Sequence, residues 1–236
     1  MSLLVLLACV TTDPGLLDDT GPDTPDPAHL CPNGAPRSSA KRDVHGFVYG
    51  DGETNPLEGV SVTPCGEPSP VGMSDAAGSW VVSMDDLEWV VIEQVHDERV
   101  PNRCVFDPVI EGGDPPYRIG MGGWDTENFP MEHLGITPEP GTTWVDVDAL
   151  DDLTGLDLAG ATIDITAPYE AAVTQDPDGT FIQSNVTNGI YDILFANVAL
   201  VPFDIVVTHP DKPECRVPGT MVGRGNDQLN MSVYCR

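Results

Sequence analysis

The stretch from residue 44 to residue 80 constrains the fold more than any other part of the chain. Residues 44–49 (VHGFVY) alternate with the period of two that is typical of a half-buried β-strand. A glycine-rich break follows, and 57–62 (LEGVSV) begins a second strand. Residues 75–78 (DAAG) form a tight turn in which Gly78 can take a positive φ. Two further strands are expected at 79–83 and 89–95. Sustained helical periodicity with caps is absent from the sequence, so we expect an all-β unit.

A weaker copy of this pattern lies further along the chain. Gly59 of LEGV matches Gly160 of LAGA at an offset of 101 residues. Gly78 of DAAGSW matches Gly179 of DPDGTF at the same offset. Two landmarks at one offset predict a tandem duplication.

A third landmark is shifted. HDERVPNRC, which begins at His96, resembles HPDKPEC, which begins at His209, at an offset of 113. The second copy therefore carries about a dozen extra residues, which we assign to 185–203. Two copies suit a pair of self-contained domains, because a solenoid needs at least three repeats. The predicted divisions are domain 1 at 41–121, a linker at 122–141 and domain 2 at 142–236.

The first copy resembles the carboxypeptidase-regulatory-like, or transthyretin-like, family of β-sandwiches. The motifs are VHGFV at 44–48, NPLEGVSV at 55–62 and DAAGSW at 75–80. The resemblance covers 41–121 and, more loosely, 142–236, where Ala161 stands in place of Val60. It implies two tandem Greek-key β-sandwiches. Members of that family are mostly non-enzymatic modules beside peptidases, in surface proteins and at the entrance of outer-membrane transporters, so the resemblance implies a scaffold or binding module and carries over no catalytic residues.

The N-terminus resembles the lipobox of bacterial lipoproteins. An apolar run at 1–8 ends in LLA before Cys9, and the acidic stretch that follows is rich in Pro, Asp, Thr and Gly. We expect 1–8 to be the remnant of a signal peptide, Cys9 to be lipidated, and 9–40 to form an acidic linker. The run is short and lacks a basic n-region. An upstream start codon, or an ordinary secreted or truncated protein, is the alternative.

The charge balance is strongly acidic, with 38 acidic and 10 basic residues and a formal net charge of -28. Such a surface repels phosphate backbones, which argues against a nucleic-acid partner. No apolar run reaches the ~18 residues of a membrane-spanning helix. The expected membrane partner is therefore reached through the lipid anchor, and the expected location is the cell envelope, on the outer membrane at its surface or periplasmic face.

The five histidines do not support metallopeptidase chemistry. They occur in neither a His-x-x-Glu nor a His-Glu-x-x-His arrangement. Gly-x-Ser-x-Gly and a phosphate-binding glycine loop are also absent from the sequence. We expect a non-enzymatic protein in which His96 and His209 are turn residues bonded to the backbone.

Calcium is the one cofactor that the sequence raises. Asp176 and Asp178 on a turn, with the acidic run at 146–152, offer the oxygen ligands that a hard cation prefers. The spacing of an EF-hand is incomplete after Gly179, and a plain Asp-Gly hairpin explains Asp178 equally well.

The cysteines predict an oxidising compartment. Cys215 and Cys235 are the only cysteines of the second unit, so we expect them to pair. In the first unit we expect Cys65 to pair with Cys104, with a bond from Cys31 to either of them as the rival. Buried free thiols are the remaining alternative.

These features favour a non-catalytic structural or interaction module. Two alternatives stay open: a carbohydrate- or protein-binding module for adhesion or uptake, and an accessory domain of an envelope peptidase or secretion complex. Trp80 is expected in the core. Trp124 and Trp144 flank the linker, where a packing role is favoured and a sugar platform is the alternative.

Overall fold

A computed structural model describes residues 40–50, 55–86, 89–106, 117–123, 130–190 and 192–236. These ranges contain the strands β1 to β16 and one short helical turn at 130–133. The all-β fold class predicted from the sequence is confirmed. Within the same ranges, no helix has the length and apolar character needed to cross a membrane.

In the first half of the chain, two sheets enclose an apolar core. The smaller sheet, in the order β4-β1-β7, consists of β1 (Lys41–Tyr49), β4 (Ser79–Asp85) and β7 (Tyr117–Gly120). The facing strands, in the order β6-β5-β2-β3, are β2 (Ser61–Pro64), β3 (Gly72–Met73), β5 (Val90–Val95) and β6 (Asn102–Phe106). Val48, Val62 and Ile92 are fully buried between them because alternate residues of each strand face inward.

The second half has the same two-layer construction. Its smaller sheet, in the order β12-β9-β14, consists of β9 (Ala159–Ile165), β12 (Val186–Asn188) and β14 (Ile205–Thr208). The facing strands are β8 (Thr143–Asp151), β10 (Ala171–Gln175), β11 (Phe181–Gln183), β13 (Ile193–Val198), β15 (Cys215–Arg216) and β16 (Gln228–Cys235). Val147, Ile163 and Phe195 are fully buried between the layers.

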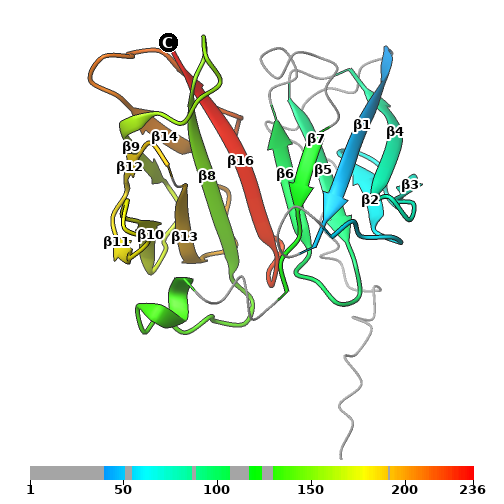
Figure 1. The fold of residues 1–236 in the computed structure, drawn as a ribbon, viewed down its shortest axis with the longest axis horizontal. Coiled ribbons are helices and arrows are strands. Elements are labelled where there is room, and N and C mark those ends of the chain that lie inside the picture. Colours follow the sequence, from blue (N-terminus) through cyan, green and yellow to red (C-terminus); the bar gives the residue numbers. More distant parts are fainter. Residues whose placement is uncertain (1–39, 51–54, 87–88, 107–116, 124–129, 191) are drawn as a thin grey trace, which may run out of the picture.

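The larger sheets of the two halves are one continuous, 10-stranded sheet. β16 runs parallel to β8 along its whole length and also pairs, in parallel, with β6 from Gln228 to Met231. Figure 1 shows β16 in the middle of the molecule, with β8 on one side and β6 on the other. The halves therefore meet through backbone pairing.

The two smaller sheets cover opposite faces of the shared sheet. One row of residues lies side by side on successive strands: Glu93, Arg103, Leu229 and Val145. Val145 faces the core of the second half. Ile92, the neighbour of Glu93 in sequence, faces the core of the first half, so Glu93 points away from that core. One face of β2 and β5 therefore covers the core of the first half. Their other face, which carries Glu93, lies on the same side of the shared sheet as the core of the second half.

A buried polar seam joins the halves beside β6 and β16. Arg103 Nη2 lies 2.6 Å from Asp227 Oδ2, and the two side chains are only 1% and 7% exposed. Arg103 Nη1 donates to the carbonyl oxygen of Val222 (2.8 Å), and Asn230 Nδ2 donates to Asn102 Oδ1 (2.6 Å). A buried charge is tolerated only when it is paired and hydrogen-bonded, so separating the halves here would leave the Arg103 guanidinium without its carboxylate.

The strand pairings place the two halves in correspondence. β8 pairs antiparallel with β13 and parallel with β16, as β1 does with β4 and β7. The Ser74 hydroxyl accepts from the Val60 amide and donates to a carbonyl oxygen at 57. The Thr187 hydroxyl does the same between the Ala161 amide and a carbonyl at 158.

The sequence match between Gly78 and Gly179 is wrong. Asp75 accepts from the amide two residues later in the turn before β4, and its counterpart before β13 is Asn188, which does the same. Gly179 lies in the β10–β11 hairpin, which pairs with the edge of β13 and has no counterpart in the described first half. The extra residues are this hairpin rather than 185–203. The two turns look alike in sequence because in both the glycine amide donates to the aspartate carbonyl oxygen at 2.8 Å.

The structure contains the predicted disulfide between Cys215 and Cys235, which ties β15 to the end of β16. The predicted bond between Cys65 and Cys104 is wrong, because Cys104 is a buried thiol and Cys65 is disulfide-bonded elsewhere. Cys104 lies opposite Ile92 and faces the core of the first half, whereas Cys65 packs with the neighbouring Val91 on the other face. The rival partner, at position 31, lies outside the described residues.

The described residues of the predicted linker are 122–123 and 130–141. Met131 and Ile136 are buried in a cluster that combines Trp144 and Val173 of the second half with Val100 of the first. Trp144 is 4% exposed, so it has the packing role that the sequence favoured and is not available for a sugar platform.

Two of the other three tryptophans are described, and both are buried. Trp80 is 2% exposed, which confirms its expected place in the core, and Trp89 is also buried. Trp124 lies outside the described residues.

Candidate functional site

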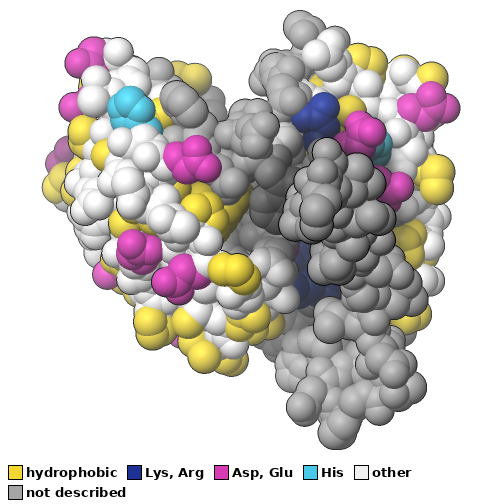
Figure 2. Space-filling view, turned by 90° about the horizontal axis from the view of Figure 1, so that it is seen from below, with side chains coloured by type: hydrophobic (Ala, Val, Ile, Leu, Met, Phe, Trp, Pro, Cys, Tyr) yellow, Lys and Arg dark blue, Asp and Glu magenta, His cyan; other side chains and the backbone are white. Residues whose placement is uncertain are grey.

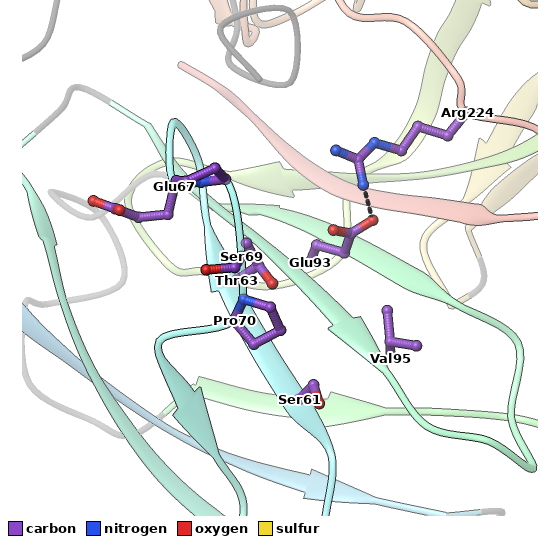
Figure 3. Close-up of a pocket in the computed structure, with 9 residues that line it drawn as sticks. Ser61, Thr63, Glu67, Ser69, Pro70, Glu93, Val95 and Arg224 are labelled. Carbon is purple, nitrogen blue, oxygen red and sulfur yellow. Dashed lines mark hydrogen bonds and ion pairs between the residues drawn. The ribbon is translucent and has the colours of Figure 1, made fainter. Parts of the chain in front are cut away.

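An open groove runs along the outward face of β2 and β5. Ser61 and Thr63 of β2 and Glu93 and Val95 of β5 line it, because the alternate residues of these strands face the core. This part of the groove encloses about 350 Å³ and is closed on one side by the 67–70 loop. Figure 3 shows these side chains gathered over the two strands.

The groove continues past Val95. A second depression of about 460 Å³ shares Ser61 and Val95 and extends to the turn that carries His96, Asp97 and Glu98. From Glu93 to Val95 the strand covers roughly 7 Å at about 3.3 Å per residue, and the turn at 96–98 extends the hollow beyond the end of β5. Because the two depressions share Ser61 and Val95, they form one channel, which we call the β2–β5 groove.

Carboxylates dominate the charge of the β2–β5 groove. Glu93 is paired with Arg224, which reaches it from the loop before β16, as the dashed line in Figure 3 marks. Glu67 has one oxygen 3.9 Å from the Lys41 ammonium. Asp97 and Glu98 are exposed on the turn at the far end. Arg224, the one guanidinium among the described residues of the lining, comes from the second half, so both halves contribute to the wall.

The two histidines in corresponding turns are bonded to the backbone, as predicted. His96 Nδ1 accepts from the Glu98 amide (3.3 Å). His209 Nδ1 accepts from the Asp211 amide (3.1 Å), and its Nε2 lies 3.0 Å from the carbonyl oxygen of Ala159. These contacts hold the rings in structural roles.

The residues considered for calcium are not brought together. Asp178 accepts from the Thr180 amide, and this hydrogen bond lowers the pKa of its carboxyl. Asp176 is in the same hairpin turn, with its amide bonded to the Thr180 carbonyl oxygen. Among the described residues, no group of three or more His, Cys, Asp or Glu side chains is arranged to hold a metal ion.

Among the described carboxylates of the acidic surface, some are paired with a basic side chain and others are not. The Lys212 ammonium beside Asp151 lowers the pKa of that carboxyl to about 2. Desolvation by the surrounding protein raises the pKa of the Asp192 carboxyl, although the residue remains exposed to solvent. The negative charge of the Asp157 carboxylate raises this pKa further. Figure 2 shows acidic side chains on both lobes of one face and only isolated basic ones.

The sequence did not point to the β2–β5 groove. Cys9, the predicted lipidation site, lies outside the described residues, and the disulfide residues are structural. The available signal was the outward alternation of Glu93 and Val95, but a half-buried strand shows the same pattern without any groove. The loop that carries Arg224 comes from a remote part of the chain, which local patterns do not reveal.

No family model matches the chain, and a search of curated proteins finds no match. Among solved structures, the chain is similar to the Bacillus anthracis TIE protein, with 11% identity, a TM-score of 0.28 and coverage of 84% of this chain and 34% of that one. It therefore spans about one third of the TIE protein.

Pilins are also among the similar structures. The shaft pilin SpaA from Lactobacillus rhamnosus GG has 10% identity and a TM-score of 0.25, with coverage of 84% of this chain and 98% of that one. The Streptococcal ancillary pilin has 10% identity and a TM-score of 0.26, with coverage of 84% and 63%. At these values the likeness carries no conclusion about function.

Proposed function

We propose that this protein is a rigid, non-catalytic structural or interaction module of the cell envelope. The observation that carries the proposal is the single sheet shared by the two halves, with the buried Arg103–Asp227 pair beside it. Two domains on a flexible connection bend independently, whereas a shared sheet transmits orientation from one end of the molecule to the other. Such a body is suited to hold a binding surface at a fixed distance and angle.

The envelope location rests on features at the two ends of the chain. The apolar run before Cys9 and the acidic stretch after it are suited to a lipid anchor and a spacer. The Cys215–Cys235 disulfide fits an oxidising compartment. The two-layer construction of each half supports the resemblance to carboxypeptidase-regulatory-like modules, which we propose as the domain type.

The second candidate is an adhesion or uptake module, and the β2–β5 groove favours a protein ligand for it. The described residues that line the groove include apolar and carboxylate side chains but no Phe, Tyr or Trp. Glycan sites usually present an aromatic face, so a glycan ligand is less well supported.

The test is made on the native chain in its own cell. Radioactive palmitate should label the wild type and not Cys9→Ser, and external protease on intact cells then distinguishes the surface from the periplasmic face. Wild-type protein that takes up no label and is recovered with the cytosol would overturn the envelope assignment. The shared-sheet rigidity has its own test, by calorimetry, which does not depend on location.

A further inference from the structure

The β2–β5 groove combines shape and charge in a way that specifies a ligand. Its floor is strand backbone with the small hydroxyl side chains of Ser61 and Thr63, and Pro68, Pro70 and Val95 add apolar surface. Val95 is 41% exposed. A channel that is open, shallow and partly apolar accommodates an extended peptide better than a compact small molecule.

The charge of the lining is one-sided. Four carboxylates line the groove, at Glu67, Glu93, Asp97 and Glu98. Arg224 pairs with Glu93 and the Lys41 ammonium lies 3.9 Å from Glu67, so the uncompensated charge is that of the turn at 97–98. Among the described residues that line their depression, neither Lys nor Arg accompanies Asp97 and Glu98. Carboxylates in a groove with low-dielectric walls attract cations more strongly than the same groups on a flat surface.

We propose that the β2–β5 groove binds an extended segment of a partner protein in which basic residues alternate with small apolar ones. The basic side chains lie over the turn at 97–98 and along Glu93, and the apolar ones contact Val95 and the prolines of the 67–70 loop. Binding is non-covalent and needs no cofactor. This inference rests on the proposed function as an interaction module and names its partner class.

The probe is a fluorescein-labelled eight-residue peptide of alternating Lys and Val, titrated with the full chain and followed by fluorescence anisotropy in 50 mM salt. A peptide with Glu in place of Lys is the charge control. The Lys peptide should bind and the Glu peptide should not. Raising the salt to 300 mM should weaken binding, because the Debye length falls below about 10 Å.

Matched variants separate the groove from the general acidity of the protein. Asp97→Asn/Glu98→Gln removes two groove carboxylates. Glu132→Gln/Asp211→Asn removes two exposed carboxylates elsewhere, and Asp211 occupies the turn after His209 that Glu98 occupies after His96. The groove variant should weaken binding about five-fold, and the control variant by less than about two-fold.

Val95→Lys provides a second test, because it places a cation in the channel at an exposed position that does not disturb the core. It should abolish binding while the circular dichroism spectrum stays that of the wild type. Equal weakening by the groove and control variants would overturn the proposal and indicate diffuse attraction to a surface of charge -28. Absence of binding to the Lys peptide would also overturn it, while leaving the envelope assignment and the rigidity to their own tests.

Discussion

The indole ring of Trp80 lies directly over Gly46. The two residues are opposite each other on β4 and β1, and a Cβ atom added at Gly46 would be 2.1 Å from Cζ2 of Trp80. The corresponding position in the second half pairs Val147 with Ile193. The two halves therefore fill the corresponding space between their sheets differently. The first half uses the large Trp80 side chain opposite a glycine, and the second uses two side chains of intermediate size.

Gly46→Ala should lower the free energy of unfolding by about 2 kcal/mol, because the added methyl group overpacks a core that has no room for it. Urea denaturation followed by tryptophan fluorescence measures the change. Gly120→Ala is the matched control: it is also a strand glycine, but a Cβ there meets nothing within 4 Å.

The double variant Gly46→Val/Trp80→Ile copies the pair found in the second half. It should recover stability relative to Gly46→Val alone, since the new side chain occupies the space that the indole leaves. Additive losses from the two changes would contradict the correspondence between the halves.

Asp227→Ala should destabilise the protein by about 3–5 kcal/mol, because it leaves the Arg103 guanidinium buried without its carboxylate. The measurement is the unfolding free energy in guanidinium chloride. Glu214→Gln breaks the exposed pair with Arg236, whose side chains are 68% and 64% exposed, and should change stability by less than about 1 kcal/mol.

The double variant Arg103→Met/Asp227→Leu tests whether the cost comes from the unpaired charge. Removing both charges leaves no buried ion, so the double variant should be more stable than Asp227→Ala. A double variant as unstable as the single one would mean that the ion pair itself, rather than the unpaired charge, sets the cost.

The Cys215–Cys235 disulfide should contribute about 3 kcal/mol, because it closes a loop across a sequence separation of 20. Cys215→Ser/Cys235→Ser should lower the unfolding free energy by that amount. Peptide mapping without reduction should find this linkage, and should find Cys104 alkylated only after denaturation, because the thiol is buried. Recovery of a peptide that links Cys65 to Cys104 would contradict the structure.

Stability should fall in acid through Asp151. Its pKa is about 2 in the folded protein, below the value of 3.8 expected when unfolded, because Lys212 favours the carboxylate. The stabilisation is therefore present above about pH 4 and is lost as the pH falls toward 2. The difference in urea midpoint between the wild type and Asp151→Asn should shrink over that interval, and a difference independent of pH would exclude this pair as the cause.

Local patterns were sufficient for the strands and several of their special residues. The alternation at 44–49 predicted β1, and the tight turn predicted at Gly78 has φ of 74°. Trp80 could be assigned to the core because an aromatic residue directly after a tight turn commonly fills the space between two sheets. These features depend on a few neighbouring residues, which a sequence displays directly.

Long-range pairing was beyond such patterns. The contact of β16 with β6 joins segments more than a hundred residues apart, and the sequence of neither strand indicates which strand it pairs with. The β10–β11 hairpin was mistaken for the counterpart of the turn at Gly78 because both use the same Asp-x-x-Gly chemistry. The Cys65–Cys104 pairing failed for a related reason: the face to which a cysteine points depends on strand register, which spacing does not determine.

Differential scanning calorimetry of the full chain tests the shared sheet most directly. We expect one transition in which the calorimetric and van't Hoff enthalpies agree, because β6 and β16 cannot separate without breaking the Arg103–Asp227 seam. Asp227→Ala should lower Tm for the whole transition. Two resolved transitions in the wild type, with only one of them moved by Asp227→Ala, would show that the halves fold independently and that the shared sheet does not couple them.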